Sequence, residues 1–305
     1  MSEEKIYLNC PFDEKDECKS LGGKWDGEEK KWYITDNMDS EPFSQWLQDS
    51  GPSILKNKSY DEPSVFQPRN LLRESRRQNG IPLGKVPRIC ILDPDGNLLD
   101  YLKNKNKALL NKFWACYHSN LYTSEIAGST VGIIPRAVGA SYAVLVAEQL
   151  FVSGCELLIS ITSAGIITNL PSDKKFTLIT EAIRDEGTSY HYITKNERAL
   201  LSPKLMLKLK NNKDLWDESK SWTTDAPYRE TQSAIKEMKI KKVTCVEMES
   251  AALYAFAKAK NKDVICFAHL TNTMAQQKGD FEKGDDFGSL DTLKLVEGVL
   301  EIFSS

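Results

Sequence analysis

From residue 86 onward, short apolar runs alternate with stretches in which apolar residues recur at helical spacing. The runs short enough to be strands lie at residues 89–92, 131–134, 157–161, 176–183, 242–246 and 264–270. Helical spacing predicts helices at residues 141–152, 249–260 and 290–303. Strands that alternate with helices along a chain predict a central, mostly parallel sheet with helices on both faces.

The first 50 residues follow a different pattern. Residues 6–8 and 31–34 alternate as two short strands, and residues 13–21 and 42–47 have the spacing of short helices. We therefore expect residues 1–50 to form a small α+β domain. Residues 51–85 are rich in Ser, Pro, Asn, Lys and Gly, which is typical of a linker, with a short basic helix expected at residues 70–78. The main domain is then expected at residues 86–305.

Composition and charge exclude some classes of partner and site. The 305 residues include 40 basic and 43 acidic ones, so overall charge gives no reason to expect a nucleic-acid or membrane partner. No apolar run approaches the roughly 18 residues of a membrane-spanning helix, and the start lacks the apolar core of a signal peptide. Seven cysteines, several in apolar surroundings, are typical of buried thiols, and we expect a cytoplasmic protein. With three histidines and neither CxxC nor HExxH, no metal site is predicted.

The main candidate for a binding group is Glu249, in the stretch CVEMESAALYAFA at residues 245–257. An apolar run carries Glu247 and Glu249 and then becomes an alanine-rich helix. In α/β sheets, side chains at such a junction face the crevice in which ligands bind. A carboxylate there can accept hydrogen bonds from both hydroxyls of a ribose. The alternative is a solvated pair of glutamates that opens a helix, where the helix dipole favours negative charge.

Four stretches, taken in order, resemble the nucleoside phosphorylase and nucleosidase family over about residues 86–305. They are AVGASYAVLVAEQLFVSGCELLISITSAG (137–165), AIRDEGTSYHY (182–192), TTDAPYRET (223–231) and VEMESAAL (246–253). The resemblance implies an α/β protein with a three-layer αβα fold, a twisted central sheet, and homo-oligomers with sites near subunit boundaries. It also implies cleavage of the N-glycosidic bond of a nucleoside or nucleotide by phosphate or water, with no metal or other cofactor.

The resemblance assigns roles to residues at matching positions. It implies that Glu249 holds the ribose hydroxyls and that Met248 packs under the sugar. Tyr228 matches an aromatic residue beside the base or sugar, where a flat ring loses little entropy. Gly139 lies in the turn after the second strand, where the lack of a side chain lets a ligand approach the backbone.

The part of the family pattern that binds phosphate is incomplete. Ser163 and Gly165 match the turn below the phosphate or attacking water, although a local hydrogen bond would also account for Ser163. Phosphorylases of the family place a glycine and then an arginine after the first strand, where this chain has Leu92 and Gly96. Their second phosphate arginine corresponds to Ser160. A phosphate dianion needs cationic partners or a backbone nest.

Two sets of residues are candidates to complete the nucleophile site. Arg136 and Arg229 are near enough in the pattern to replace the missing arginines. Asp93 and Asp95, in the loop after the first strand, would instead repel phosphate and could orient and deprotonate a water. Nucleosidases of the family use a carboxylate from this loop in that role. The segment DPDG is also a common turn composition, with no role in chemistry.

Asn272 stands where many purine-specific members of the family have an aspartate that protonates the leaving base. An amide cannot deliver a proton, but it can hydrogen-bond a purine N7 or a pyrimidine carbonyl. The acidic residues of GDFEKGDD, at 279–286, either supply another acid or form a solvated loop. Three functions therefore stay open: a hydrolytic nucleosidase, a phosphorylase with inorganic phosphate as co-substrate, and a binding module whose catalysis has decayed. An intact Glu249 beside an incomplete phosphate site favours hydrolysis.

The N-terminal pattern YLNCPFDEKDECKSLGGKWDGEEKKWYI, at residues 7–34, resembles a small bacterial domain of unknown function that is fused to DNA-processing and plasmid proteins. Its tryptophans, with Lys24, Lys30 and Lys31, could contact nucleic acid. The alternative is a structural appendage with its aromatic residues in a core, and the acidic residues mixed among the lysines favour it.

Overall fold

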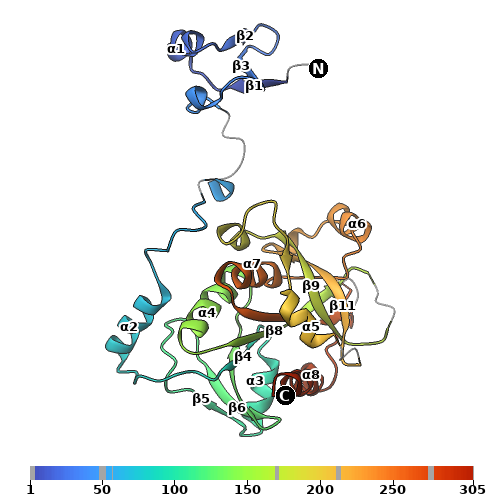
Figure 1. Cartoon of the computed structure of the whole chain (residues 1–305). Helices are drawn as coiled ribbons and strands as arrows, with labels where there is room; N and C mark the ends of the chain where they lie inside the picture. Colours follow the sequence, from blue (N-terminus) through green and yellow to red (C-terminus); the bar gives the residue numbers. More distant parts are fainter. Residues whose placement is uncertain are drawn as a thin grey trace. The chain divides into compact units, whose positions relative to one another are not determined.

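A computed structural model describes residues 4–47, 53–56, 58–168, 172–210, 214–273 and 278–304. The chain forms two compact units, residues 1–57 and residues 58–305, which we describe one at a time (Figure 1). Within the described ranges, no helix is both long and apolar enough to cross a bilayer.

The first unit is a three-stranded antiparallel sheet with a short helix. The strands, in the order β1-β3-β2, are β1 (Lys5–Leu8), β3 (Lys31–Thr35) and β2 (Lys24–Asp26). The helix is α1 (Lys15–Ser20), and the expected helix at 42–47 is a single 3-10 turn, Glu41–Phe43. One face of the sheet covers a core formed by Leu8, Cys18, Ile34, Phe43 and Trp46. The predicted small α+β domain is confirmed.

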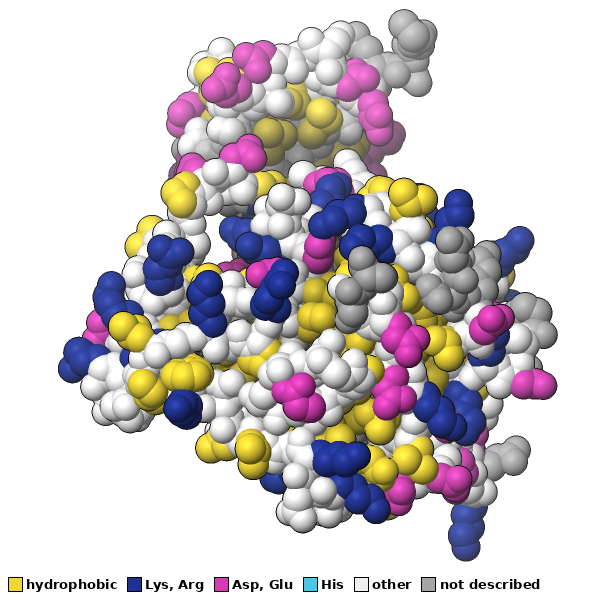
Figure 2. All heavy atoms as spheres, turned by 60° about the horizontal axis from the view of Figure 1, so that its bottom comes forward, with side chains coloured by type: hydrophobic (Ala, Val, Ile, Leu, Met, Phe, Trp, Pro, Cys, Tyr) yellow, Lys and Arg dark blue, Asp and Glu magenta, His cyan; other side chains and the backbone are white. Residues whose placement is uncertain are grey.

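The outer face of this sheet carries a local group of cations and tyrosines. Side chains alternate along a strand, and the residues opposite the core are Lys5, Tyr7, Lys24, Asp26, Lys31, Tyr33 and Thr35. Asp26 accepts hydrogen bonds from Lys5 and Tyr7. The unit as a whole is acidic, with seven lysines against thirteen acidic residues, and the side seen in Figure 2 carries mostly Asp and Glu. Net negative charge opposes binding to nucleic-acid phosphates. A nucleic-acid partner stays a prediction. If the unit binds one, the lysines make the outer face of the sheet the surface that repels phosphates least.

The second unit is built on a sheet to which the described residues contribute ten strands. Its path is β10-β9-β11-β12-β8-β4-β7-β6-β5, and β13 pairs with both β8 and β9. The central pairs β7–β4, β4–β8, β8–β13, β9–β11 and β11–β12 are parallel, while β12 joins β8 antiparallel. The strands are β4 (Ile89–Asp93), β5 (Ala108–Leu110), β6 (Tyr122–Ile126), β7 (Ser129–Pro135), β8 (Leu157–Ile166), β9 (Phe176–Asp185), β10 (Ala199–Leu200), β11 (Asp217–Thr224), β12 (Cys245–Glu247) and β13 (Asp263–Asn272).

Helices cover both faces of this sheet (Figure 1). On one face α4 packs against α7, and on the other α3 packs against α8. In α4 the buried residues Ala143, Val146, Ala147 and Leu150 recur at helical spacing, which explains why its sequence forms an amphipathic helix. The helices of the unit are α2 (Pro68–Asn79), α3 (Asn97–Asn104), α4 (Ala140–Val152), α5 (Pro203–Leu209), α6 (Gln232–Ile240), α7 (Ser250–Lys260) and α8 (Ser289–Ser304). The predicted three-layer αβα fold is confirmed.

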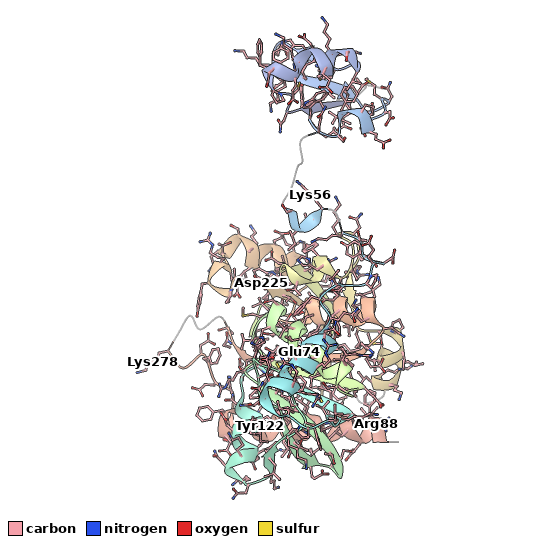
Figure 3. The ribbon with its side chains drawn as sticks, turned by 90° about the vertical axis from the view of Figure 1, so that its left-hand side faces the viewer. Lys56, Glu74, Arg88, Tyr122, Asp225 and Lys278 are labelled. Carbon is pink, nitrogen blue, oxygen red and sulfur yellow. The ribbon has the colours of Figure 1, made fainter. Side chains whose placement is uncertain are left out.

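Residues 58–85, which the sequence analysis assigned to a linker, lie in the second unit. They contain α2, a helix longer than the one expected at 70–78, and α2 packs against α4 (Figure 3, in which Glu74 marks α2). Leu72 and Ser75 are buried, while the arginines of α2 face solvent. Tyr60 also docks on this unit, because its hydroxyl donates to the carbonyl of Tyr190. The polar composition of residues 58–85 indicated a linker because the apolar face of α2 is narrow.

The docking of α2 leads to a prediction about stability. Leu72→Ala should lower the free energy of unfolding of the second unit by about 2 kcal/mol or more, because it removes a buried side chain from a packed helix. Arg73→Ala, one position along on the exposed side, should have little effect. Chemical unfolding of the two variants checks this. Equal stabilities would mean that α2 does not stay docked in solution.

Candidate active site

The junction between β12 and α7 buries two carboxylates. Glu247, at the end of β12, accepts hydrogen bonds from the Ser221 and Thr223 hydroxyls of β11. It also accepts from the backbone N–H groups of Glu249 and Ser250, at 2.8 and 2.7 Å. These four donors satisfy Glu247 within the protein and fix the start of α7. Glu247 therefore has a structural role and no lone pair set aside for a ligand.

Glu249 is held by only one of its two carboxylate oxygens. Its side chain is 1% exposed, and its Oε1 accepts from the backbone N–H of Gly139 at 2.7 Å. Its Oε2 is buried and has no hydrogen-bond partner in the described part of the chain. Burial, followed by the nearby charge of Glu247, raises the pKa of Glu249 above its ordinary value, and the Gly139 N–H offsets part of this. An unpartnered buried oxygen is unfavourable, so this oxygen indicates a place for a hydroxyl from a ligand.

Gly139 owes its identity to its conformation. It precedes α4 with φ 91°, which side chains rarely adopt, and an added Cβ would meet no atom within 4 Å. The backbone N–H can thus point at Glu249 while the space above the turn stays open. Met248, which follows Glu247, is half-buried. Gly139, Met248 and Glu249 are therefore brought together, as the resemblance implied.

The ends of β8 and β13 lie beside this junction. Gly165 of β8 is opposite Val246 of β12 and opposite Asn272 of β13. The register of β13 shifts between Leu270 and Asn272, which turns the strand end. Asn272 is nearly buried, and its amide donates to the Thr271 hydroxyl at 3.1 Å. Gly165 and Asn272 therefore belong to the same edge of the sheet as Glu249.

The two aspartates after β4 have different surroundings. Asp93 is buried, and its carboxylate accepts from the backbone N–H groups of Gly96 at 3.1 Å and Leu99 at 3.0 Å. Burial raises the pKa of Asp93 to about 7. Its hydrogen bonds fix the loop before α3 and turn it away from solvent. Of the two predicted catalytic aspartates, the structure thus gives Asp93 a structural environment, and Asp95 is the one that points outward.

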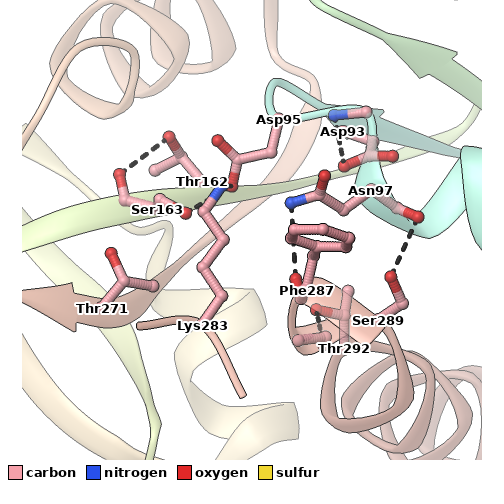
Figure 4. A network of polar contacts seen from close by, with 12 residues as sticks. Asp93, Asp95, Asn97, Thr162, Ser163, Thr271, Lys283, Phe287, Ser289 and Thr292 are labelled. Carbon is pink, nitrogen blue, oxygen red and sulfur yellow. Dashed lines mark hydrogen bonds and ion pairs between the residues drawn. The ribbon is translucent and has the colours of Figure 1, made fainter. Parts of the chain in front are cut away.

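Asp95 takes part in a polar network with two other elements (Figure 4). The Ser163 hydroxyl of β8 donates to Asp95 Oδ2. Lys283 Nζ lies 3.0 Å from the same oxygen, and the side chains of Asp95 and Lys283 are 29% and 15% exposed. The sequence analysis noted the acidic loop that contains Lys283 but did not consider its lysine. The only signal was one lysine at the centre of GDFEKGDD.

His269 is a second group that the sequence analysis did not consider. It lies on β13, is buried, and stacks on Phe176 with ring centroids 4.5 Å apart. Burial lowers the pKa of His269 to about 4, so its imidazole is neutral near pH 7. Gly288 packs against this ring, because a Cβ at Gly288 would lie 2.5 Å from His269 Cε1.

The remaining predicted residues differ in position. Arg136 forms an exposed ion pair with Asp100 at 2.8 Å, and its guanidinium also packs on Gly96 of the loop after β4, where an added Cβ would lie 2.4 Å from Arg136 Nε. Tyr228 is 100% exposed on a 3-10 turn, Pro227–Arg229, and Arg229 is exposed as well. Ser160 is buried in β8, and its hydroxyl has no partner among the described residues. Of the two arginines proposed to replace the missing phosphate ligands, Arg136 therefore lies against the loop that carries Asp95 and Arg229 lies on an exposed turn, and their role stays a prediction.

Comparison with known proteins identifies the larger unit. A family model described as the phosphorylase superfamily matches residues 88–299, more than half of the chain. The chain belongs to the phosphorylase superfamily. The predicted family is confirmed, and so is the prediction of an enzyme of the nucleoside phosphorylase type.

Solved structures of nucleoside phosphorylases share this superfamily fold. Uridine phosphorylase from Vibrio fischeri superposes with a TM-score of 0.60 at 17% identity, over 72% of this chain and 96% of that one. Purine nucleoside phosphorylase from Toxoplasma gondii, in complex with immucillin-H, gives 0.59 at 14% identity, over 73% and 94%. At these identities the likeness establishes the fold.

The N-terminal unit has relatives of its own. Residues 5–48 match a domain of unknown function (DUF5710), which confirms the second resemblance. Two DNA primases named TraC from Escherichia coli are 38% and 39% identical over 61 and 56 residues. These matches cover 20% and 18% of this chain but 6% and 4% of the primases. The chain thus spans only a small part of the length of these curated relatives.

The half-satisfied Glu249 has a measurable effect on stability. Its pKa is raised in the folded chain above the ordinary value of 4.5, so folding resists its ionisation. The free energy of unfolding that this group contributes therefore falls as the pH rises above about 4.5. Glu249→Gln, which cannot ionise, should lose less stability than the unmodified chain between pH 5 and pH 8. Asp93 titrates in both proteins, so the difference between their free energies of unfolding reports Glu249 alone. Urea unfolding at each pH measures this difference, and parallel pH profiles of the two proteins would contradict the prediction.

Proposed function

We propose that the second unit cleaves the N-glycosidic bond of a nucleoside, with water as the nucleophile. The observation that carries the proposal is the buried, unpartnered Oε2 of Glu249, and the Asp95 network supplies a second carboxylate. Two consecutive residues of β8 connect these carboxylates. The Thr162 hydroxyl is among the groups that lower the pKa of Glu249, although it donates to the Ser163 carbonyl, and the Ser163 hydroxyl donates to Asp95. One carboxylate can then hold the sugar while the other faces its reacting carbon.

Glu249 supplies the hold on the ribose. Burial raises the pKa of Glu249 to about 8, and a ribose hydroxyl that donates to its free oxygen favours the ionised form. A hydrogen bond to that charged acceptor contributes about 1.5–3 kcal/mol. The bond that breaks joins the anomeric carbon to a base nitrogen, and the sugar gains positive charge as it breaks. A carboxylate fixed below the sugar stabilises that charge, provided that it needs no reorganisation. The donation from Gly139 fixes Glu249 before the substrate arrives.

Asn272 is the candidate for contact with the leaving base. It lies at the end of β13, opposite Gly165, where its amide can donate to a purine N7 or to a carbonyl oxygen of a pyrimidine. Asn272 cannot protonate the base. General acid catalysis commonly contributes ~10²–10⁴-fold, so we expect a lower rate with bases that need protonation to leave.

The charges around the nucleophile position favour water. A phosphate beside the Asp95–Lys283 pair would meet no net positive charge, and a phosphate dianion needs cationic partners or a backbone nest. Lys283 is already paired with Asp95 and Arg136 with Asp100. A neutral water has no such requirement, and it can donate to Asp95 or to the Ser163 hydroxyl oxygen.

Phosphorolysis is the second candidate function. Two observations favour it: Lys283 places a cation at the edge of the site, and the solved relatives named above are phosphorylases. Inorganic phosphate would then be the co-substrate. The two reactions differ in their sugar product, which is ribose for water and ribose 1-phosphate for phosphate.

A nucleoside panel tests the proposed function. Uridine, inosine and adenosine should be incubated in phosphate-free buffer and again with phosphate, and both products identified. We expect free ribose at a rate that does not depend on phosphate. Glu249→Gln, which keeps the size of the side chain but removes the charge, should lower turnover at least tenfold.

Other outcomes would redirect the proposal. Ribose 1-phosphate formed at a rate that saturates with phosphate would reject hydrolysis in favour of phosphorolysis. Binding of a nucleoside without turnover in either buffer would support a binding module on this fold. Unchanged kinetics in Glu249→Gln would reject its role in holding the ribose.

A further inference from the structure

The segment that delivers Lys283 has an unusual backbone. Residues 278–288, which we call the strap, lie between β13 and α8, and Lys278 marks their beginning in Figure 3. Asp286 and Phe287 have φ of 48° and 56°, a region that bulky side chains rarely occupy, and they lie between Gly284 and Gly288, which also have positive φ. Such strain persists only where surrounding contacts fix it, and it concentrates at functional sites.

Contacts with α3 and β13 fix the strap. The Asn97 amide donates to the Phe287 carbonyl at 3.4 Å, and the Ser289 hydroxyl donates to the Asn97 carbonyl at 2.9 Å (Figure 4). The backbone N–H of Glu282 donates to the carbonyl of Thr271 at 3.2 Å. The strap thus connects the loop that carries Asp95 to the strand that carries Asn272.

Lys283 is the lysine of the strap whose side chain these contacts cover. Most residues of the strap are exposed, but the Lys283 side chain is largely covered and Nζ lies 3.0 Å from Asp95 Oδ2. A neighbouring lysine, Lys175, forms a separate pair with Asp291 at 2.5 Å. His269 faces both pairs and adds no charge near pH 7, because burial lowers its pKa to about 4. Ser163, Thr162 and Thr271 supply hydroxyls around the first pair (Figure 4).

We propose that the Asp95–Lys283 pair determines which nucleophile the enzyme accepts. With Asp95 present, the charge of Lys283 is neutralised and the site takes water. Without Asp95, the same lysine and the surrounding hydroxyls form a site for a phosphate anion, and the reaction becomes phosphorolytic. This inference rests on the proposed function and goes beyond it, because it assigns the choice of nucleophile to two named residues.

The two reactions break the same bond. In hydrolysis a water oxygen bonds to the anomeric carbon, and the carbon–nitrogen bond breaks with its electron pair leaving on the base. Asp95 receives the proton of the water, and the base takes a proton from solvent. In the variant reaction an oxygen of inorganic phosphate bonds to the anomeric carbon and gives ribose 1-phosphate, while the base takes its proton from solvent. Inorganic phosphate is the only added reactant.

The test compares five variants with the unmodified full chain. Asp95→Asn removes the carboxylate and keeps the shape, and Asp95→Ser is a second version in case the first folds poorly. Lys283→Met and the double variant Asp95→Asn, Lys283→Met remove the cation. Lys175→Met is the matched control, since Lys175 also faces His269 but pairs with Asp291. Each protein is assayed with the nucleoside panel in phosphate and in chloride at equal ionic strength.

The expected pattern is specific to the pair. Asp95→Asn should form ribose at least tenfold more slowly and should form ribose 1-phosphate at a rate that saturates with phosphate. The double variant should lose that phosphate-dependent product, and Lys175→Met should resemble the unmodified chain. Phosphate should also raise the melting temperature of Asp95→Asn relative to chloride, without a nucleoside, and should not do so for the unmodified chain or the double variant.

The melting measurement separates this inference from the proposed function. If the unmodified chain turns over no nucleoside, the proposed function fails, while phosphate stabilisation of Asp95→Asn alone would still support the phosphate site. If the unmodified chain hydrolyses a nucleoside but neither aspartate variant binds phosphate or forms ribose 1-phosphate, the inference is wrong. An equal change of product in Lys175→Met would also overturn it, because the effect would then not belong to the pair.

Discussion

The burial of two carboxylates, Glu247 and Glu249, at the junction between β12 and α7 is the constraint on which the site depends. A buried carboxylate is tolerated when hydrogen bonds replace the water that it has lost. Glu247 receives four such bonds, from β11 and from the start of α7. Glu249 receives one, from Gly139. Because Glu247 is fully satisfied and fixes the first turn of α7, Glu249 has one orientation, and its second oxygen is left for a ligand.

The same constraint explains which part of the fold the sequence could predict. Strands with apolar runs, such as β4, β8 and β13, were found because burial on both faces gives continuous apolar segments. The strand β11 was missed, because the segment DESKSWTT buries hydroxyls where its neighbours bury methyl groups. Two of those hydroxyls, on Ser221 and Thr223, are the donors that Glu247 requires. A strand that serves a buried charge therefore lacks the pattern by which strands are recognised.

The candidate site divides in the same way. Glu249, Met248, Gly139 and Asn272 lie at strand ends and tight turns, whose positions follow from the order of strands, so sequence and resemblance together brought them to one edge. Lys283 could not be predicted, because its position depends on how the strap folds back onto the loop after β4. The arginines suggested as phosphate ligands were equally unpredictable. Asp100, one turn into α3, pairs with Arg136, and no pattern in the sequence marks that pair.

In the proposed function, sugar binding and nucleophile selection depend on different kinds of structure. The sugar side is built from strand register and helix starts, where a change would disturb the buried carboxylates and the sheet around them. The nucleophile side is built from a loop and the strap, which meet through side chains such as Asp95 and Lys283 and through a few bonds to Asn97. Substitutions there alter the local charge while the sheet stays intact. This difference between the two sides explains why the sequence keeps the family pattern at residues 246–253 and departs from it at residues 92–96. The choice of nucleophile is therefore the part of the proposed reaction that can change with the smallest effect on the fold.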